Sequence, residues 1–284
     1  MITLRNEEMT VVISPVGAEM QSVTAANGTD YLWDGDPQFW PQHAPVMFPI
    51  CGGLKNDEYH YNGKTYSLAK HGFGKYETFE VESHSETEAV FLLRSNEKTL
   101  AVYPFAFELR IGYALNGKSI VVTYDVKNPS ADPLYMSIGA HEAYACPEGI
   151  QDYEVVFSQP ETLLTTPRPM NSYDTELIME NQTVLPMDYK YFHIDALIFK
   201  KCVKSTSVQL RHKKTGRGVR VDFEGFPYLL IWTKPNTQAP YLCIEPWCGI
   251  SDTPDTTGDI TQKEGINRVE GGGTFHRVHT ITLL

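Results

Sequence analysis

The chain has 284 residues, of which 42% are hydrophobic and 12% aromatic, so it can bury a sizeable core without disulfides or metal ions. Its formal net charge of −11 is diffuse and leaves no basic stripe, so we expect no nucleic-acid partner. No apolar run is long enough to cross a bilayer, and we expect no membrane partner.

The N-terminal segment MITLRNEEMTVVIS carries charges within its apolar stretch, so it predicts a first strand and not a signal peptide. The cysteines are Cys51, Cys146, Cys202, Cys243 and Cys248. They are odd in number, scattered, and without a C-x-x-C pair, a pattern typical of reduced thiols. We therefore expect a cytoplasmic protein.

Apolar and polar residues alternate with period two along most of the chain, which predicts short strands. In chain order these strands cover residues 9–15, 79–85, 89–95, 107–115, 119–128, 208–214, 218–223, 228–234 and 275–284. Turn signals lie at Asn27-Gly28, Asn62-Gly63, Asn116-Gly117 and Thr215-Gly216. Many short strands with dense turns predict an all-β sandwich or barrel.

Longer irregular segments separate some of the strands, at residues 34–57, 139–151, 167–193 and 247–265. A weak helical pattern is present near residues 185–193. Loops of this length in a compact β protein usually carry function or cover a cleft. Because no linker or composition break divides the sequence, we expect one domain over residues 1–284.

The segment PYLCIEPWCGI, residues 240–250, places Glu245 in an apolar run. In a strand, Cys243, Glu245 and Trp247 share one face while Leu242 and Ile244 share the other. A carboxyl group among apolar neighbours has a raised pKa and suits proton transfer near neutral pH. The alternative is a strand-end glutamate that pairs with an arginine or reaches water.

The sequence lacks the motifs of several common active sites: it contains no G-x-G-x-x-G, P-loop, H-E-x-x-H or G-x-S-x-G pattern. His276 and His279 stand an odd number apart in a strand and point to opposite faces, so they do not share a metal. We expect neither a metal site nor a cofactor.

Polar residues also stand at predicted strand ends in glycine-rich or apolar contexts. His71 lies in KHGFGK, His141 in GAHEAY, and Asp195 precedes the apolar ALIF. Each has a structural explanation as well: backbone carbonyls can satisfy the histidines, and Asp195 can cap a turn.

Six sequence blocks, in order, resemble the aldose 1-epimerase (galactose mutarotase-like) superfamily, and in particular its bacterial branch of LacX-like and hexose-6-phosphate mutarotase-like proteins. The blocks cover residues 31–59, 70–75, 139–144, 195–199, 241–250 and 263–273. The resemblance implies a large antiparallel β-sandwich with an open cleft on a curved sheet. It also implies interconversion of the α and β anomers of a sugar, without a cofactor.

The resemblance further implies roles for individual residues. Glu245 would be the base at the C1 hydroxyl and His141 the acid at the ring oxygen, while His71 and Asp195 would hold sugar hydroxyls. Trp33, Trp40 and Trp247 are candidates to line the cleft against the apolar face of the sugar.

The sequence departs from the family pattern at two positions. Gly53 stands where the family usually carries a substrate-binding arginine, so we expect a larger pocket or a substitute cation, with Lys55 and Lys75 the nearest. Glu142 replaces a common proline and would either raise the pKa of His141 or face solvent. The sugar is therefore left open between galactose, glucose, another aldose and a 6-phosphorylated sugar.

Two other functional classes remain as alternatives. A non-catalytic sugar-binding or sensing protein on the same fold is compatible with the loss of the arginine. A glycoside hydrolase or lyase would need two carboxylates, for which only Glu245 and Asp195 are available. We expect a monomer or a homodimer, with a small sugar as the partner.

Overall fold

The computed structural model describes residues 1–166, 174–200 and 203–284. Within these residues the chain is built almost entirely of antiparallel strands, and the single α-helix is the short α1 (Glu97–Val102). The predicted all-β class is therefore confirmed. Part of the irregular segment predicted at 167–193 and one cysteine, Cys202, lie outside the described residues.

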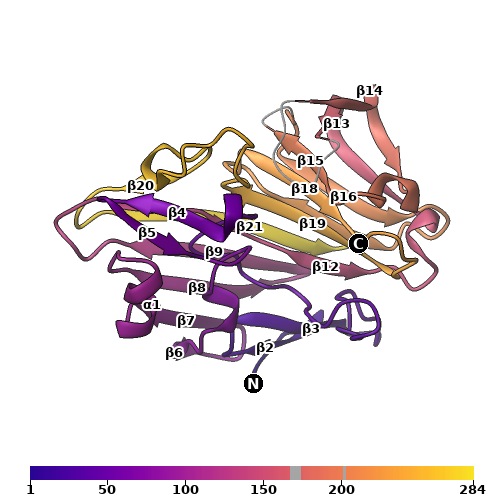
Figure 1. Cartoon of the computed structure of the whole chain (residues 1–284). Coiled ribbons are helices and arrows are strands. Elements are labelled where there is room, and N and C mark those ends of the chain that lie inside the picture. Colours follow the sequence, from indigo (N-terminus) through magenta and orange to yellow (C-terminus); the bar gives the residue numbers. More distant parts are fainter. Residues whose placement is uncertain (167–173, 201–202) are drawn as a thin grey trace.

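The largest sheet has nine strands in the order β14-β13-β16-β17-β21-β9-β8-β7-β6. In chain order its strands are β6 (Glu80–His84), β7 (Glu88–Arg94), β8 (Glu108–Asn116), β9 (Ser119–Lys127), β13 (Tyr153–Thr165), β14 (Glu176–Pro186), β16 (Ser207–His212), β17 (Gly218–Asp222) and β21 (Thr274–Leu283). The C-terminal strand β21 joins the two halves of the sheet (Figure 1).

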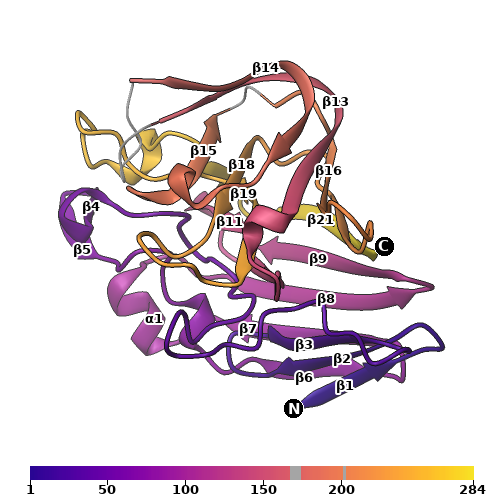
Figure 2. The same cartoon turned by 90° about the vertical axis from the view of Figure 1, so that its right-hand side faces the viewer.

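The sheet that carries the site is formed by β11 (Ile138–Gly139), β19 (Tyr241–Cys248), β18 (Tyr228–Trp232) and β15 (Leu197–Lys200), with β12 (Glu142–Ala145) also paired to β19. The nine-stranded sheet curves beside it, so that β13 and β14 rise next to β15 (Figure 2). A hydrogen bond from the backbone N–H of Ile198 on β15 to Oγ1 of Thr165 on β13, 2.8 Å long, ties the two sheets together.

Smaller sheets and helical turns complete the molecule. The remaining strands are β1 (Ile2–Arg5), β2 (Met9–Ser14), β3 (Glu19–Ala25), β4 (Glu58–Tyr61), β5 (Lys64–Ser67), β10 (Leu134–Met136) and β20 (Asn267–Val269). The 3-10 turns are η1 (Lys55–Asp57), η2 (Gly74–Tyr76), η3 (Ile150–Asp152), η4 (Tyr189–Phe192) and η5 (Ile260–Gln262). Strands β1 to β3 form one small sheet, β4 pairs with β5, and β10 pairs with β20.

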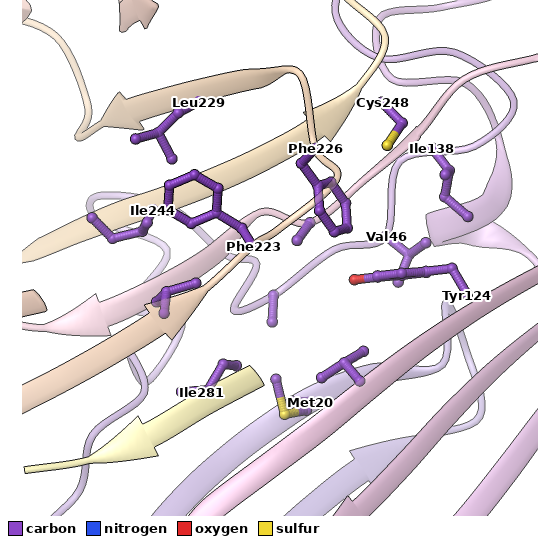
Figure 3. Packing of buried hydrophobic residues seen from close by; sticks show 14 of the residues in the cluster. Met20, Val46, Tyr124, Ile138, Phe223, Phe226, Leu229, Ile244, Cys248 and Ile281 are labelled. Carbon is purple, nitrogen blue, oxygen red and sulfur yellow. The ribbon is translucent and has the colours of Figure 1, made fainter. Parts of the chain in front are cut away.

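The main core lies between the site sheet and the nine-stranded sheet (Figure 3). Leu229 and Ile244 point inward from β18 and β19, and Tyr124 and Ile281 meet them from β9 and β21. Because one face of the site sheet is anchored in this core, its opposite face is held rigidly enough to support a site.

Local sequence signals explain where several elements begin and end. At the predicted Asn62-Gly63 turn both residues have positive φ, 46° and 74°, as the tight turn between β4 and β5 requires. The weak helical pattern near 185–193 corresponds to the end of β14 and the turn η4. Helix α1 was not predicted, although Asn96 and Thr99 form a capping box at its start.

None of the helices in the described part of the chain is long and apolar enough to cross a membrane. The single-domain organisation and the oligomeric state remain predictions.

Candidate active site

Strand β19 forms the floor of the site, and all of its residues are buried. Leu242 and Ile244 belong to the main core. Cys243, Glu245 and Trp247 lie on the other face, where Cys243 and Trp247 contribute to two small clusters of their own. The alternation predicted for this segment is confirmed.

The register of the sheet brings His141 to Glu245. Glu142, the first residue of β12, pairs with Ile244, so His141 stands opposite Glu245 one position beyond the paired strand. The Nε2 atom of His141 lies 3.3 Å from Oε2 of Glu245. On the other side of Glu245, Leu230 of β18 is its cross-strand partner.

Gly139 makes room for the residues that follow it. It pairs with Trp247, and a Cβ atom at this position would lie 2.8 Å from the Trp247 ring and 2.8 Å from the Met47 side chain. A hydrogen bond from Ala140 N–H to Pro246 O, 3.1 Å, continues the pairing toward His141. A larger residue in place of Gly139 would push the strand, and with it His141, away from β19.

Above this floor the chain leaves an open cleft with a cavity volume of about 210 Å³. Its lining residues are Trp40, Gln42, Pro45, Met47, Lys70, His71, Lys75, His141, Asp195, Ala196, Ile198, Leu230, Trp232, Glu245, Trp247 and Ser251. The structure thus brings together most of the predicted site residues, namely His71, Lys75, His141, Asp195, Glu245, Trp247 and the candidate Trp40, whereas Trp33 lies outside the lining.

His71 is held in an unusual backbone conformation, with φ of 69°. Its N–H donates to Gly52 O at 2.9 Å, and its Nδ1 accepts from Gly52 N–H at 3.1 Å. Because Nδ1 is an acceptor, the neutral ring carries its proton on Nε2, where it can donate to a ligand. The ring meets His141 and Trp247 edge-on, with centroids 5.6 Å apart in both cases.

Charged groups on two loops stand at the side of the cleft. Asp195, between η4 and β15, has its Oδ2 3.7 Å from Nζ of Lys70. Lys75, in η2, is also a lining residue and has its Nζ 5.1 Å from the Tyr76 ring centroid. The cleft therefore offers both an acceptor and two cations to a polar ligand.

The tryptophans have different positions. Trp40 stacks on His141 with ring centroids 5.0 Å apart, and Trp247 lines the cleft beside Glu245. Trp33 is buried beneath Trp40: its Nε1 donates to Trp40 O at 2.8 Å, and its ring packs on Tyr241 at 4.8 Å. Trp33 thus supports the segment that carries Trp40.

Burial dominates the electrostatics of the site. Loss of hydration raises the pKa of Glu245 well above its ordinary value, opposed by the nearby Lys70 charge. The same loss lowers the pKa of His141 to about 3 and that of His71 well below its usual value, and Lys70 and Lys75 add to both. The alternative of an arginine-paired Glu245 does not apply, because the cleft contains no arginine among the described residues.

Glu142 and Lys55 do not take part in the cleft. Glu142 points into the core, where its Oε1 lies 3.2 Å from Nε2 of His279. Glu142 is therefore buried away from solvent, and it is not one of the causes of the shifted pKa of His141. Both predicted roles of Glu142 are wrong. Lys55 donates from Nζ to Pro254 O at 2.8 Å, outside the cleft.

Sequence reasoning missed Lys70, Trp232 and Gln42 as lining residues. The only local signal for Lys70 was its place directly before His71. Trp232 on β18 lies opposite Cys243 on β19. The alternation within β18 does not determine this register, so the sequence of that strand alone could not place Trp232 in the cleft.

The fold and the cleft define a galactose mutarotase-like β-sandwich. A galactose mutarotase related enzyme from Lactobacillus acidophilus matches with a TM-score of 0.93 and 34% identity, covering 100% of this chain and 97% of the other. A galactose mutarotase-like protein from Lactobacillus casei matches with a TM-score of 0.92 and 27% identity over 100% of both chains.

The chain belongs to the aldose 1-epimerase family, whose model matches residues 1–264. It is also 35% identical to the plasmid-encoded protein LacX of Lactococcus lactis subsp. lactis, over 100% of this chain and 99% of the relative.

Proposed function

We propose that this protein is an aldose 1-epimerase that interconverts the α and β anomers of a free or phosphorylated aldose. The observation that carries the proposal is the contact between Nε2 of His141 and Oε2 of Glu245, 3.3 Å apart on the floor of an open cleft. Simple binding of a sugar does not require an acid and a base side by side.

The reaction needs one proton on the pair. Glu245 takes the proton of the C1 hydroxyl while His141 gives a proton to the ring oxygen, the bond from C1 to the ring oxygen breaks, and C1 becomes a carbonyl carbon. After rotation about C1–C2 the carbonyl presents its other face, and the two transfers run in reverse to close the ring. Burial disfavours a separated pair of charges in the empty cleft, and hydroxyl groups of the sugar supply the polar contacts that support it.

Other lining residues have positioning roles in this proposal. His71 Nε2–H donates to a sugar oxygen, and Asp195 accepts from a sugar hydroxyl while Lys70 holds its carboxylate. Trp40 and Trp247 contact the apolar face of the sugar ring, because aromatic side chains commonly pack against the flat apolar surface of a ligand.

The choice of sugar rests on the cations and on Gly53. Apart from its chain neighbours, no atom of the described residues would lie within 4 Å of a Cβ added to Gly53, so there is open space at the position where the family resemblance expects an arginine. Lys70 and Lys75 are the lining cations, and either can pair with a phosphate oxygen. Both free and 6-phosphorylated aldoses are therefore candidate substrates, and the experiment includes both.

The experiment is magnetisation-exchange NMR on the α and β anomeric protons of free and 6-phosphorylated aldoses, with and without protein. Coupling of the two signals identifies the substrate. Glu245→Gln should lower the exchange rate about 10²–10⁴-fold while leaving sugar binding nearly unchanged, since the shape of the cleft is kept and the base is lost. Sugar binding without exchange in the unmodified protein would replace the enzyme by the non-catalytic sugar-binding protein. Release of a glycosidic leaving group would point to the hydrolase instead.

A further inference from the structure

Cys243 is a thiol on the cleft face of β19 that the proposed proton transfers do not use. It stands two positions before Glu245 on the same strand, while His141 stands opposite Glu245 on the neighbouring chain segment. One ligand atom from each of the three residues lies within 4.8 Å of the other two, and all three residues are buried. The pleated sheet thus gathers a nitrogen, an oxygen and a sulfur donor at one corner.

We propose that Cys243, His141 and Glu245 form a reversible binding site for a soft divalent metal ion, with Zn²⁺ as the reference ion, and that an ion bound there blocks the sugar site. This assignment replaces the sequence-based expectation of no metal site. His141 is about a hundred positions away from Cys243 and Glu245 in the sequence, so no metal-binding sequence motif could reveal the three residues as a set.

The distances suit a tetrahedral ion. Zinc lies about 2.0–2.3 Å from nitrogen, oxygen and sulfur ligands, so two ligand atoms of one ion are separated by about 3.5 Å. Nε2 of His141 and Oε2 of Glu245 are already 3.3 Å apart. Sγ of Cys243 lies within 4.8 Å of both atoms, so ion binding requires rotation of the Cys243 side chain together with shifts of the other two.

The ligand set also selects the ion. A thiolate with an imidazole favours Zn²⁺ over Mg²⁺ and Ca²⁺, which prefer oxygen ligands. Glu245 and His141 line the cleft, so the fourth coordination position opens toward it and a water molecule can occupy it. On binding, the thiol proton of Cys243 and the single proton held by the His141–Glu245 pair both pass to solvent, and the bonds from Zn²⁺ to sulfur, nitrogen and oxygen form in their place.

Two features indicate exchangeable binding and not a resident ion. Dedicated zinc sites usually hold the second nitrogen of each histidine ligand with an acceptor, but Nδ1 of His141 is buried and has no hydrogen-bond partner within residues 1–166, 174–200 and 203–284. The Lys70 charge acts on Glu245 and repels a cation there. Because the ion and the proton transfers need the same atoms of His141 and Glu245, binding and turnover exclude each other.

The first test measures binding directly, in a Cys202→Ser background so that only thiols of the described residues can respond. Zn²⁺ is titrated against a chromophoric chelator, and Co²⁺ is added separately to detect thiolate-to-cobalt charge-transfer absorption. We expect one Zn²⁺ per chain and the charge-transfer band. Cys243→Ser should remove the band and weaken Zn²⁺ binding by more than about 100-fold, because even loss of an outer hydrogen-bond partner costs about 10–100-fold.

Cys248→Ser is the matched control. Cys248 is a buried thiol on the same strand, but it belongs to the main core on the opposite face. This variant should keep both the cobalt band and the Zn²⁺ affinity. Cys243→Ala, checked for folding by circular dichroism, repeats the test without a hydroxyl. Unchanged Zn²⁺ affinity in a folded Cys243 variant, or a cobalt complex without the charge-transfer band, would overturn the site.

The second test uses anomer exchange and therefore rests on the proposed function. Zn²⁺ should inhibit exchange competitively with the sugar, EDTA should restore it, and Mg²⁺ at the same concentration should have no effect. Cys243→Ser should retain the basal exchange rate and lose the sensitivity to Zn²⁺. If no sugar shows exchange, the proposed function fails while the cobalt spectrum still decides the metal site.

Discussion

Nζ of Lys263 lies 2.8 Å from Oδ1 of Asp252, and both side chains are almost completely buried. Oδ2 of Asp252 also accepts a hydrogen bond from the backbone N–H of Lys55 at 2.9 Å. The backbone N–H of Asp252 donates to Gly53 O at 2.9 Å. The pair therefore joins the chain after β19 to the loop that contains Gly53. Ser251, the neighbour of Asp252, lines the cleft.

Lys263→Met should be strongly destabilising, because it leaves Asp252 as an uncompensated charge in the interior. We expect a loss of about 3–5 kcal/mol in the free energy of unfolding, measured by urea denaturation. The double variant Asp252→Asn with Lys263→Met should lose less than the sum of the two single variants. Strict additivity would show that the two side chains do not interact.

Glu245→Gln should make the protein more stable than the unmodified form at alkaline pH. Burial raises the folded-state pKa of Glu245 above its unfolded value, so the stability that it contributes is complete below the unfolded pKa and is lost as pH rises through the folded one. Glutamine is neutral throughout. The difference in Tm between the two proteins should therefore grow in favour of the variant as the pH rises from the ordinary glutamate pKa of about 4.3 toward the raised one, and a constant difference would contradict the raised pKa.

The rate of anomer exchange should not decline near the ordinary pKa of histidine as the solution is made acidic. In the proposed reaction the His141–Glu245 pair holds one proton, and a second proton binds only when His141 is titrated at its lowered pKa of about 3. The single proton is lost at the raised pKa of Glu245, which sets the alkaline limb. We expect a rate at about pH 5 close to the maximum. An acid limb with an apparent pKa near 6.5 would disprove the effect of burial on His141.

Substitutions of His71 should separate its backbone role from its role in the cleft. Asparagine tolerates the positive φ of 69° and can accept the hydrogen bond of Gly52, whereas alanine does neither. His71→Ala should therefore be less stable than His71→Asn by about 1 kcal/mol. Both variants should raise KM in anomer exchange, because both remove the ring. Equal stabilities would show that the backbone at this position is not strained.

Local patterns were sufficient to predict what one strand does alone. The alternation in β19 correctly placed Glu245 and Trp247 on one face and Ile244 on the other, since the period of a strand is independent of its neighbours. It likewise placed His276 and His279 on opposite faces: His276 is exposed beside Asp125, and His279 is buried.

Relationships between distant segments were beyond the reach of these patterns. The contact of His141 with Glu245 depends on the register of β12 against β19, which packing of the whole sheet fixes and which the family resemblance alone suggested. Glu142 shows the same limit. Its charge predicted an effect on its neighbour or exposure to solvent, but strand alternation and a partner on β21, His279, bury it on the other face.

One face of strand β19 packs in the core and the other lies at the floor of the cleft, and all of its residues are buried. A substitution on its cleft face therefore acts on a strand that also carries Leu242 and Ile244 in the main core. Trp40, Lys70 and Asp195 lie in connections between strands. Under the proposed function, new sugar preferences should therefore arise by changes in the walls of the cleft, while the residues of its floor that carry the chemical step stay the same.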